Sequence, residues 1–208
     1  MFRLRLVALW LASLYGPSLL PAQATQELAP GVAVPASGTV FALDKTARES
    51  TSLVQFHPSE IVSNSHAPGN LARSAVYIGA RSSIELAGIN AAVHLESGDT
   101  SVFFRLSTDD PEILRKRVTL IRLKQDRDRR IVSSYSQNIF GGQRSRKYDE
   151  IAVVKTDVAD GQWLKLTPVV PLPPGEYGIV VLPKDTNLFA DIVYDFDVDL
   201  NAAKDDTK

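Results

Sequence analysis

The chain has no cysteine among its 208 residues. Disulfide bridges are therefore excluded, and so is the lipid attachment that a bacterial lipoprotein signal directs to a cysteine. In an exported chain of this length, the absence of bridges is more typical of bacteria than of animal secretions.

The sequence also lacks the motifs by which common enzymes are identified. It contains no G-x-S-x-G, no P-loop, no dinucleotide fingerprint and no H-E-x-x-H. The three histidines, His57, His66 and His94, do not have the spacing of a zinc site, and we expect them to be surface or half-buried residues. Scattered carboxylates can form a hydrolase without leaving a motif, so enzymatic activity stays open and no residue is assigned as catalytic.

Strong net charge is missing as well, because the formal value is −1. This balance argues against bulk attraction to nucleic acid or to a membrane surface. The middle of the chain is nevertheless basic, and two interpretations stay open: a patch that binds a polyanionic envelope polymer, or a hairpin that the acidic C-terminal strand neutralises. The basic residues are Arg115, Lys116, Arg117, Arg122, Lys124, Arg127, Arg129, Arg130, Arg144, Arg146 and Lys147.

Residues 1–24 have the pattern of a secretory signal peptide. Arg3 and Arg5 precede an apolar run from Leu6 to Tyr15, and small residues surround the expected cleavage site after Ala24. The run is too short to span the roughly 30 Å of membrane hydrocarbon. We therefore expect a secreted or periplasmic protein that has no membrane span after cleavage.

The remaining chain shows short β-type segments separated by turn residues, without a sustained helical period. This rhythm predicts an all-β fold, an antiparallel β-sandwich (immunoglobulin-like or related) of about eight to ten short strands, preceded by the signal-peptide helix. We expect a spacer at 25–38, a single sandwich domain at 39–200 and a disordered tail at 201–208. One helical turn near 112–116, capped by Asp110, and a hairpin with a charged tip at 117–135 are also predicted.

The most informative stretch is 170–199, which predicts two adjacent strands. Pro174 and Gly175 favour a type II turn, since proline fixes φ at the second position and glycine supplies a positive φ at the third. Tyr177 follows at the start of a strand, and its buried hydroxyl is expected to donate to a nearby backbone group.

Two resemblances rest on this stretch. The pattern L-x-P-G-x-Y-x-I, from Leu172 to Ile179, resembles the strand openings of carboxypeptidase-regulatory-like and transthyretin-like domains. The segment PGEYGI followed by Y-D-F-x-V-D is similar to a C-terminal signature of uncharacterised exported bacterial β-sandwich proteins, in which glycine is common where this chain has Asp197. Both resemblances imply a strand and its turn, and neither implies an activity.

Asp195, Asp197 and Asp199 alternate at the end of the chain and would share one face of a strand. Like charges at this spacing repel one another unless water, arginine or a cation compensates them. Calcium is the metal that suits such ligands, but the sequence after Asp199 lacks the glycine and glutamate of a calcium loop. We therefore favour a solvated or arginine-paired face, with Tyr194, Phe196 and Val198 in the core, and keep calcium as the weaker alternative.

Loop residues are the remaining candidates for function. Asn64, His66 and Asn70 lie in a stretch rich in turn formers and are binding-loop candidates. Trp163 is expected in the core, although an exposed Trp163 would suit stacking on a sugar. The sequence thus favours an exported, non-enzymatic binding module for an unknown protein or envelope glycan. The alternatives are a carbohydrate-binding or carbohydrate-active module and, less favoured, a calcium-stabilised one.

Overall fold

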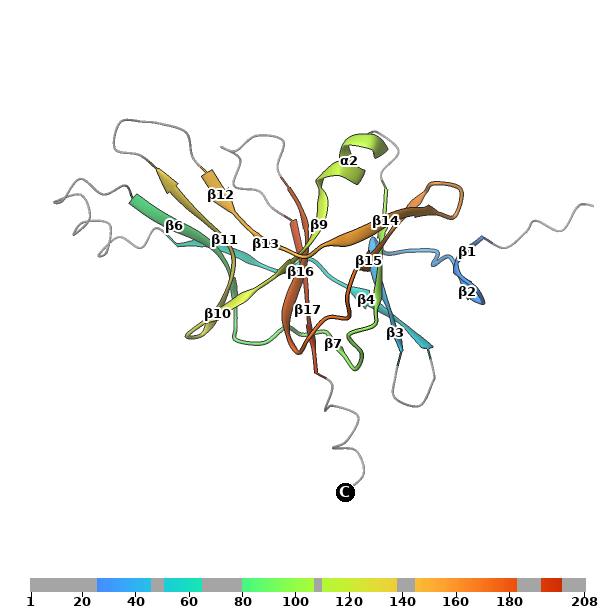
Figure 1. The fold of residues 1–208 in the computed structure, drawn as a ribbon, viewed down its shortest axis with the longest axis horizontal. Helices are drawn as coiled ribbons and strands as arrows, with labels where there is room; N and C mark the ends of the chain where they lie inside the picture. The colour runs from blue at the N-terminus through green and yellow to red at the C-terminus, as the bar shows by residue number, and fades with distance from the viewer. Residues whose placement is uncertain are drawn as a thin grey trace, which may run out of the picture.

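The computed structural model describes residues 26–45, 51–64, 80–106, 110–137, 145–182 and 192–199. These residues form three five-stranded sheets, one small hairpin and one short helix, which confirms the all-β fold class (Figure 1). The sandwich has a third layer, because one sheet lies between the two others. The expected signal-peptide helix and the expected tail lie outside the described residues.

The central sheet contains the predicted C-terminal strand pair. Its order is β13 (Asp149–Glu150), β9 (Val118–Arg122), β16 (Gly175–Val181), β17 (Ile192–Val198) and β7 (His94–Leu95). β16 and β17 pair antiparallel along their whole length, whereas β7 joins β17 in parallel. β16 is almost continuously apolar because both of its faces are covered, as is usual for a strand in a middle layer.

The first outer sheet packs on one face of the central sheet. Its order is β14 (Val153–Val158), β15 (Trp163–Pro168), β8 (Ser101–Arg105), β3 (Val40–Lys45) and β4 (Thr51–Phe56), and all its pairs are antiparallel. The core between the two sheets includes a stack of rings in which Phe196 lies between Tyr177 and Phe56. Tyr194, Phe196 and Val198 are all buried there, as the alternation of β17 predicted.

The second outer sheet covers the opposite face of the central sheet. It runs in the order β10 (Lys124–Asp126), β11 (Arg129–Gln137), β6 (Ala80–Ala87) and β5 (Ile61–Asn64), and β12 (Ser145–Lys147) also pairs with β11. Its core against the central sheet contains Ile84, Leu86 and Val132 on one side and Ile121, Val180 and Val193 on the other. Residues 61–64 were expected to be loop, and they form the edge strand β5 of this sheet.

The chain passes from the central sheet to the second outer sheet through a bend between two consecutive strands. β9 belongs to the central sheet, but after Leu123 the chain enters the second outer sheet as β10. The predicted hairpin at 117–135 therefore pairs only near its charged tip, where β10 meets β11. The predicted helical turn is present as α2 (Pro111–Arg117), and Asp110 caps it by accepting a hydrogen bond from the Ile113 backbone N–H at 3.3 Å.

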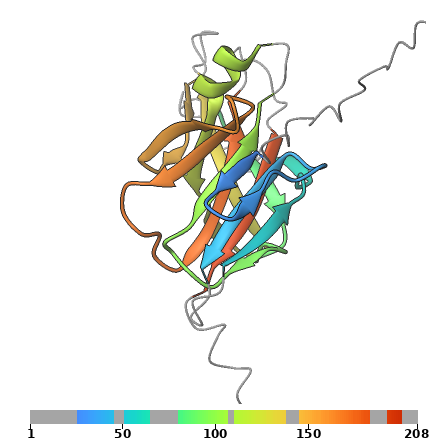
Figure 2. The same cartoon turned by 90° about the vertical axis from the view of Figure 1, so that its right-hand side faces the viewer.

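A small hairpin covers the outer face of the first outer sheet. β1 (Glu27–Ala29) and β2 (Val32–Ala33) lie over that sheet (Figure 2), and Leu28 is buried against Phe41, Phe103 and Trp163. These residues belong to the segment 25–38, which the sequence indicated as a spacer. Their burial shows that this part of the segment packs on the sheet.

Before β16 the chain bends, with Tyr177 buried and Gly175 at a positive φ as expected, but without the φ of roughly +80° that the predicted type II turn requires at its glycine. The Tyr177 side chain is fully buried, and its hydroxyl donates to the Pro173 carbonyl at 2.6 Å. Gly175 has a φ of +149°, a positive value that favours glycine, and it is already the first residue of β16 opposite Val198. Pro174 immediately precedes Gly175 and therefore lies just outside β16.

Candidate functional site

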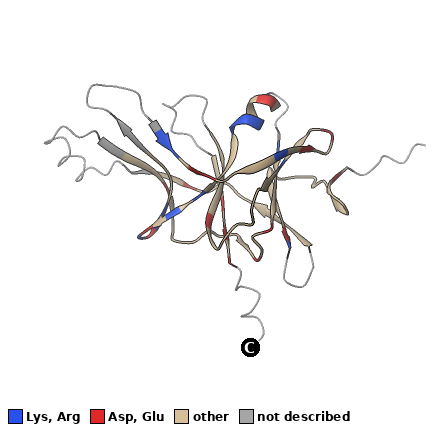
Figure 3. Cartoon of the chain, in the orientation of Figure 1, with Lys and Arg blue, Asp and Glu red and all other residues tan. Residues whose placement is uncertain are grey.

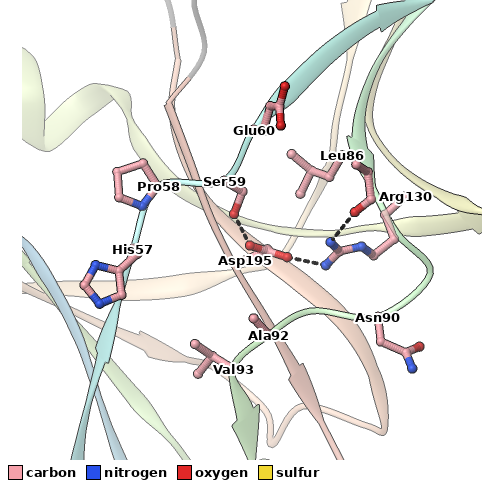
Figure 4. Close-up of a pocket in the computed structure, with 11 residues that line it drawn as sticks. His57, Pro58, Ser59, Glu60, Leu86, Asn90, Ala92, Val93, Arg130 and Asp195 are labelled. Carbon is pink, nitrogen blue, oxygen red and sulfur yellow. Dashed lines mark hydrogen bonds and ion pairs between the residues drawn. The ribbon is translucent and has the colours of Figure 1, made fainter.

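A pocket opens where the chain passes from β4 to β5. Residues 57–60 make this crossover, and the Ser59 N–H donates to the Val193 carbonyl at 2.8 Å, which fixes the crossover against the edge of β17. The opposite wall comes from the segment between β6 and β7. The cavity has a volume of about 320 Å³ and is called the crossover pocket below (Figure 4). Its lining residues are His57, Pro58, Ser59, Glu60, Leu86, Ala87, Asn90, Ala92, Val93, Arg130 and Asp195.

Arg130 lies at the floor of this pocket and is only 3% exposed. Its Nη1 group donates to Glu176 at 3.2 Å and also to Asp195. Its Nε and Nη2 groups donate to the backbone carbonyls of Gly88 and Ala87, each at 3.1 Å. A buried guanidinium requires such partners. Through them Arg130 connects β11 to β16, to β17 and to the segment that follows β6.

The two carboxylates on Arg130 each have a second donor. Asp195 accepts a hydrogen bond from the Ser59 hydroxyl, and Glu176 accepts one from the Ala91 N–H at 3.0 Å. Burial raises the pKa of Glu176 above its ordinary value, and Asp197 adds to this effect, while Arg130 opposes it. Arg130, Glu176, Asp195 and Ser59 are called the Arg130 cluster below.

The three alternating aspartates of the sequence have different surroundings, and one of them belongs to the Arg130 cluster. Asp195 is paired with arginine, as the favoured interpretation predicted, and is 9% exposed. Asp197 contacts His94 instead, with 2.6 Å between its Oδ1 and the histidine Nδ1. Asp199 lies just after the end of β17 and is exposed, and its N–H donates to the Leu95 carbonyl. Within the described residues, no group of three or more acidic or histidine side chains has the arrangement of a metal site.

The cluster does not have the geometry of a nucleophilic enzyme. In Figure 4 the hydroxyl of Ser59 faces Asp195, while His57 points away from both of them. A serine nucleophile needs a base that accepts its proton, usually a histidine oriented by the carboxylate. Here the carboxylate that accepts the hydrogen bond from Ser59 is already paired with Arg130. The arrangement therefore connects the crossover to the central sheet and does not set up a proton transfer.

The upper part of the pocket has an apolar wall and a polar rim. Pro58, Leu86, Ala92 and Val93 supply apolar surface, whereas His57, Glu60 and Asn90 are exposed polar residues at the rim. His57 and Glu60 are close in sequence, but their side chains point in different directions (Figure 4). Among the described residues Glu60 has no ion-pair partner.

Of the three binding-loop candidates from the sequence, the structure describes the backbone of Asn64 alone. Asn64 is the last residue of β5, where it pairs with Ser83, and His66 and Asn70 lie outside the described residues. The sequence drew attention to Arg130 only as one of many basic residues and did not single out Glu176 or Ser59. Glu176 had a usable signal, because a charged residue inside the apolar β16 run needs a buried partner.

The aromatic and basic residues complete the comparison with the sequence. Trp163 is fully buried, which confirms its place in the core, and the described phenylalanine rings are buried too. Tyr148 is half-buried, and none of the aromatic side chains whose burial the structure describes is exposed. Basic side chains are interspersed with acidic ones along the ribbon (Figure 3). Several are paired, including Arg130 with the acidic strand, as one of the two interpretations predicted.

No helix in the described part of the chain has the length and apolar character to cross a bilayer. Comparison with family models, with curated proteins and with solved structures found no match for this chain.

Proposed function

We propose that the protein is an exported, non-enzymatic binding module, and that the crossover pocket receives a basic side chain of a partner protein. The observation that carries this proposal is the division of the pocket into a charge-paired floor and an open rim. Asp195 at the floor is neutralised by Arg130, while Glu60 at the rim keeps an exposed carboxylate. A lysine or arginine could lay its aliphatic stem on the apolar wall and place its charge beside Glu60.

The charge balance supports a cationic ligand over an anionic one. Arg130 is the one arginine of the floor, and it already faces both Glu176 and Asp195. Adding Glu60 leaves more carboxylate than guanidinium around the pocket. An anionic ligand would have to displace one of the buried carboxylates from Arg130, and that leaves a buried charge unpaired.

The size and lining of the pocket favour a protein partner over a glycan. About 320 Å³ is near the lower end of the range for small-ligand sites and suits one long side chain. Sugar-binding sites commonly use exposed aromatic rings, and among the described side chains the pocket wall carries none. The carbohydrate alternative therefore has no structural feature in its favour within these residues.

The experiment is a capture and binding assay with matched variants. The wild-type chain, Ala92→Phe, Ala33→Phe and Glu60→Gln are each immobilised and exposed to an envelope extract of the producing cells. Binding of the captured protein is then measured with purified components. Ala92→Phe fills the pocket, whereas Ala33→Phe adds the same ring to an exposed position on β2, away from the pocket.

We expect Ala92→Phe to weaken binding about tenfold or more, as for residues at the centre of an interface, with Ala33→Phe unchanged. Glu60→Gln should weaken binding and reduce its dependence on salt. Equal binding by wild type and Ala92→Phe would overturn the proposed site. Turnover of peptides, esters or glycans by the purified protein in a broad activity screen would overturn the non-enzymatic role.

A further inference from the structure

Within the described residues, the first outer sheet ends in an edge strand with one unpaired side. β14 is the terminal strand of the order β14-β15-β8-β3-β4, and no described strand pairs with its outer side. It lies with β15 at one margin of the molecule in Figure 2. Four of its six residues are exposed. Edge strands of this kind pair with other chains unless some feature prevents it.

The backbone groups that face outwards can be identified from the pairing of β14 with β15. Val169 donates its N–H to the Ala152 carbonyl at 3.0 Å, so residue 152 directs its backbone towards β15. Backbone direction alternates along a strand, and the register continues through Val153 opposite Pro168. Val153, Lys155 and Asp157 therefore present their N–H and C=O groups to the open side.

The side chains at these outward positions carry opposite charges. Lys155 and Asp157 are both exposed, and Arg115 of α2 contacts each of them. The Lys155 ammonium donates to the Arg115 carbonyl at 2.8 Å, and the Arg115 Nε donates to Asp157 at 2.8 Å. α2 thus holds the two charges in place at the edge. The alternate position Val154 is 56% exposed, an unusual value for a strand valine.

We propose that β14 pairs antiparallel with β14 of a second copy of this chain, about a two-fold axis at Thr156. In this register Lys155 of each copy lies opposite Asp157 of the other, and Val154 lies opposite Val158. The outward N–H and C=O groups of positions 155 and 157 then meet each other, as hydrogen bonding between the strands requires. The two first outer sheets become one continuous sheet.

The order of the two charges along β14 favours this register over the shifted ones. A shift that moves the axis to Lys155 places the two lysines opposite each other, and one that moves it to Asp157 does the same for the aspartates. Shifts that bring an outward position opposite an inward one leave the backbone groups without partners. Two-fold symmetry needs a self-complementary surface, and the order of positive then negative charge, read in opposite directions, supplies it.

The test is sedimentation velocity over a concentration series, with charge variants of the edge. We expect the wild type to dimerise with a dissociation constant in the micromolar range, since a single strand pair buries a small area. Lys155→Glu places Glu opposite Asp157 twice per dimer and should weaken dimerisation about tenfold or more. Asp157→Lys should do the same by opposing lysines, and Lys155→Arg should retain the dimer.

Mixing the two variants gives the decisive measurement. Lys155→Glu and Asp157→Lys together restore opposite charges at both pairs, so the mixture should form heterodimers at concentrations where each variant alone stays largely monomeric. Far-UV circular dichroism establishes that each variant is folded. A wild type that stays monomeric throughout the series, or a mixture that stays monomeric, overturns the proposal. Dimerisation of Lys155→Glu equal to that of the wild type would also overturn it, because the contact would then lie elsewhere.

Discussion

Replacement of Arg130 by methionine tests the physical account of the pocket floor. The arginine is 3% exposed and joins two buried carboxylates, Glu176 and Asp195, that are 5% and 9% exposed. Methionine keeps much of the apolar stem but removes the positive charge and all four hydrogen bonds. Both carboxylates then remain buried without a cation.

The expected loss is about 3–5 kcal/mol, the range for removing one partner of a buried ion pair. The carbonyls of Ala87 and Gly88 also lose their donors, so the upper part of that range is expected. For a chain of this length, each kcal/mol corresponds to a fall of about 2–4 °C in the melting temperature. A fall on the order of 10 °C is therefore predicted.

Urea denaturation at neutral pH, followed by circular dichroism, measures this loss. Lys124→Met is the matched control, because it removes one positive charge from an exposed position of β10 and should change stability by less than about 0.5 kcal/mol. The triple variant Arg130→Met, Glu176→Gln, Asp195→Asn should recover much of the loss by removing the unpaired charges. A loss under about 1 kcal/mol for Arg130→Met, or a triple variant no more stable than the single one, would refute the reasoning.

Four further results are expected. Burial raises the pKa of Glu176 above 4.5, so the folded chain keeps that proton where the unfolded chain has lost it. The unfolding free energy of the wild type minus that of Glu176→Gln should therefore decrease from about pH 4.5 towards neutral, and a flat or rising difference in urea titrations would contradict this. Gly175→Val should destabilise by about 1–3 kcal/mol, because φ is positive and a Cβ atom would lie 3.3 Å from the Arg122 guanidinium; unchanged thermal stability would count against it. Tyr177→Phe should lose about 1 kcal/mol through its bond to Pro173, measured in the same way, and no loss would mean that water replaces the bond. Melting temperatures in calcium and in chelator should agree within about 1 °C, and a rise of several degrees with calcium would reverse the preference for arginine pairing.

The sequence predicted a fold of short strands, but it did not predict how these strands are divided among layers. Period and turn residues predicted the adjacent pair β16–β17, because it is a local pattern of burial. The third layer was missed since alternation does not reveal which sheet covers a face. One signal was present: the unbroken apolar run of β16 requires cover on both sides, and Val180 faces one core while Ile179 faces the other.

The pocket was less accessible to sequence reasoning. Alternation placed Asp195 on the face opposite Phe196 and indicated an arginine partner, but not which arginine, because that choice depends on how β11 lies over β17. Ser59 reaches Asp195 only through the crossover between two sheets. A partner 136 residues away along the chain leaves no local pattern.

The position of β16 and β17 in the middle layer has a consequence for biosynthesis. A ribosome delivers the amino end first, yet the two cores that flank the central sheet need these two strands, which follow all the other described strands along the chain. Neither flanking layer can complete its core against the central sheet until β16 and β17 emerge. The order of synthesis thereby delays the burial of both apolar interfaces until β16 and β17 are available.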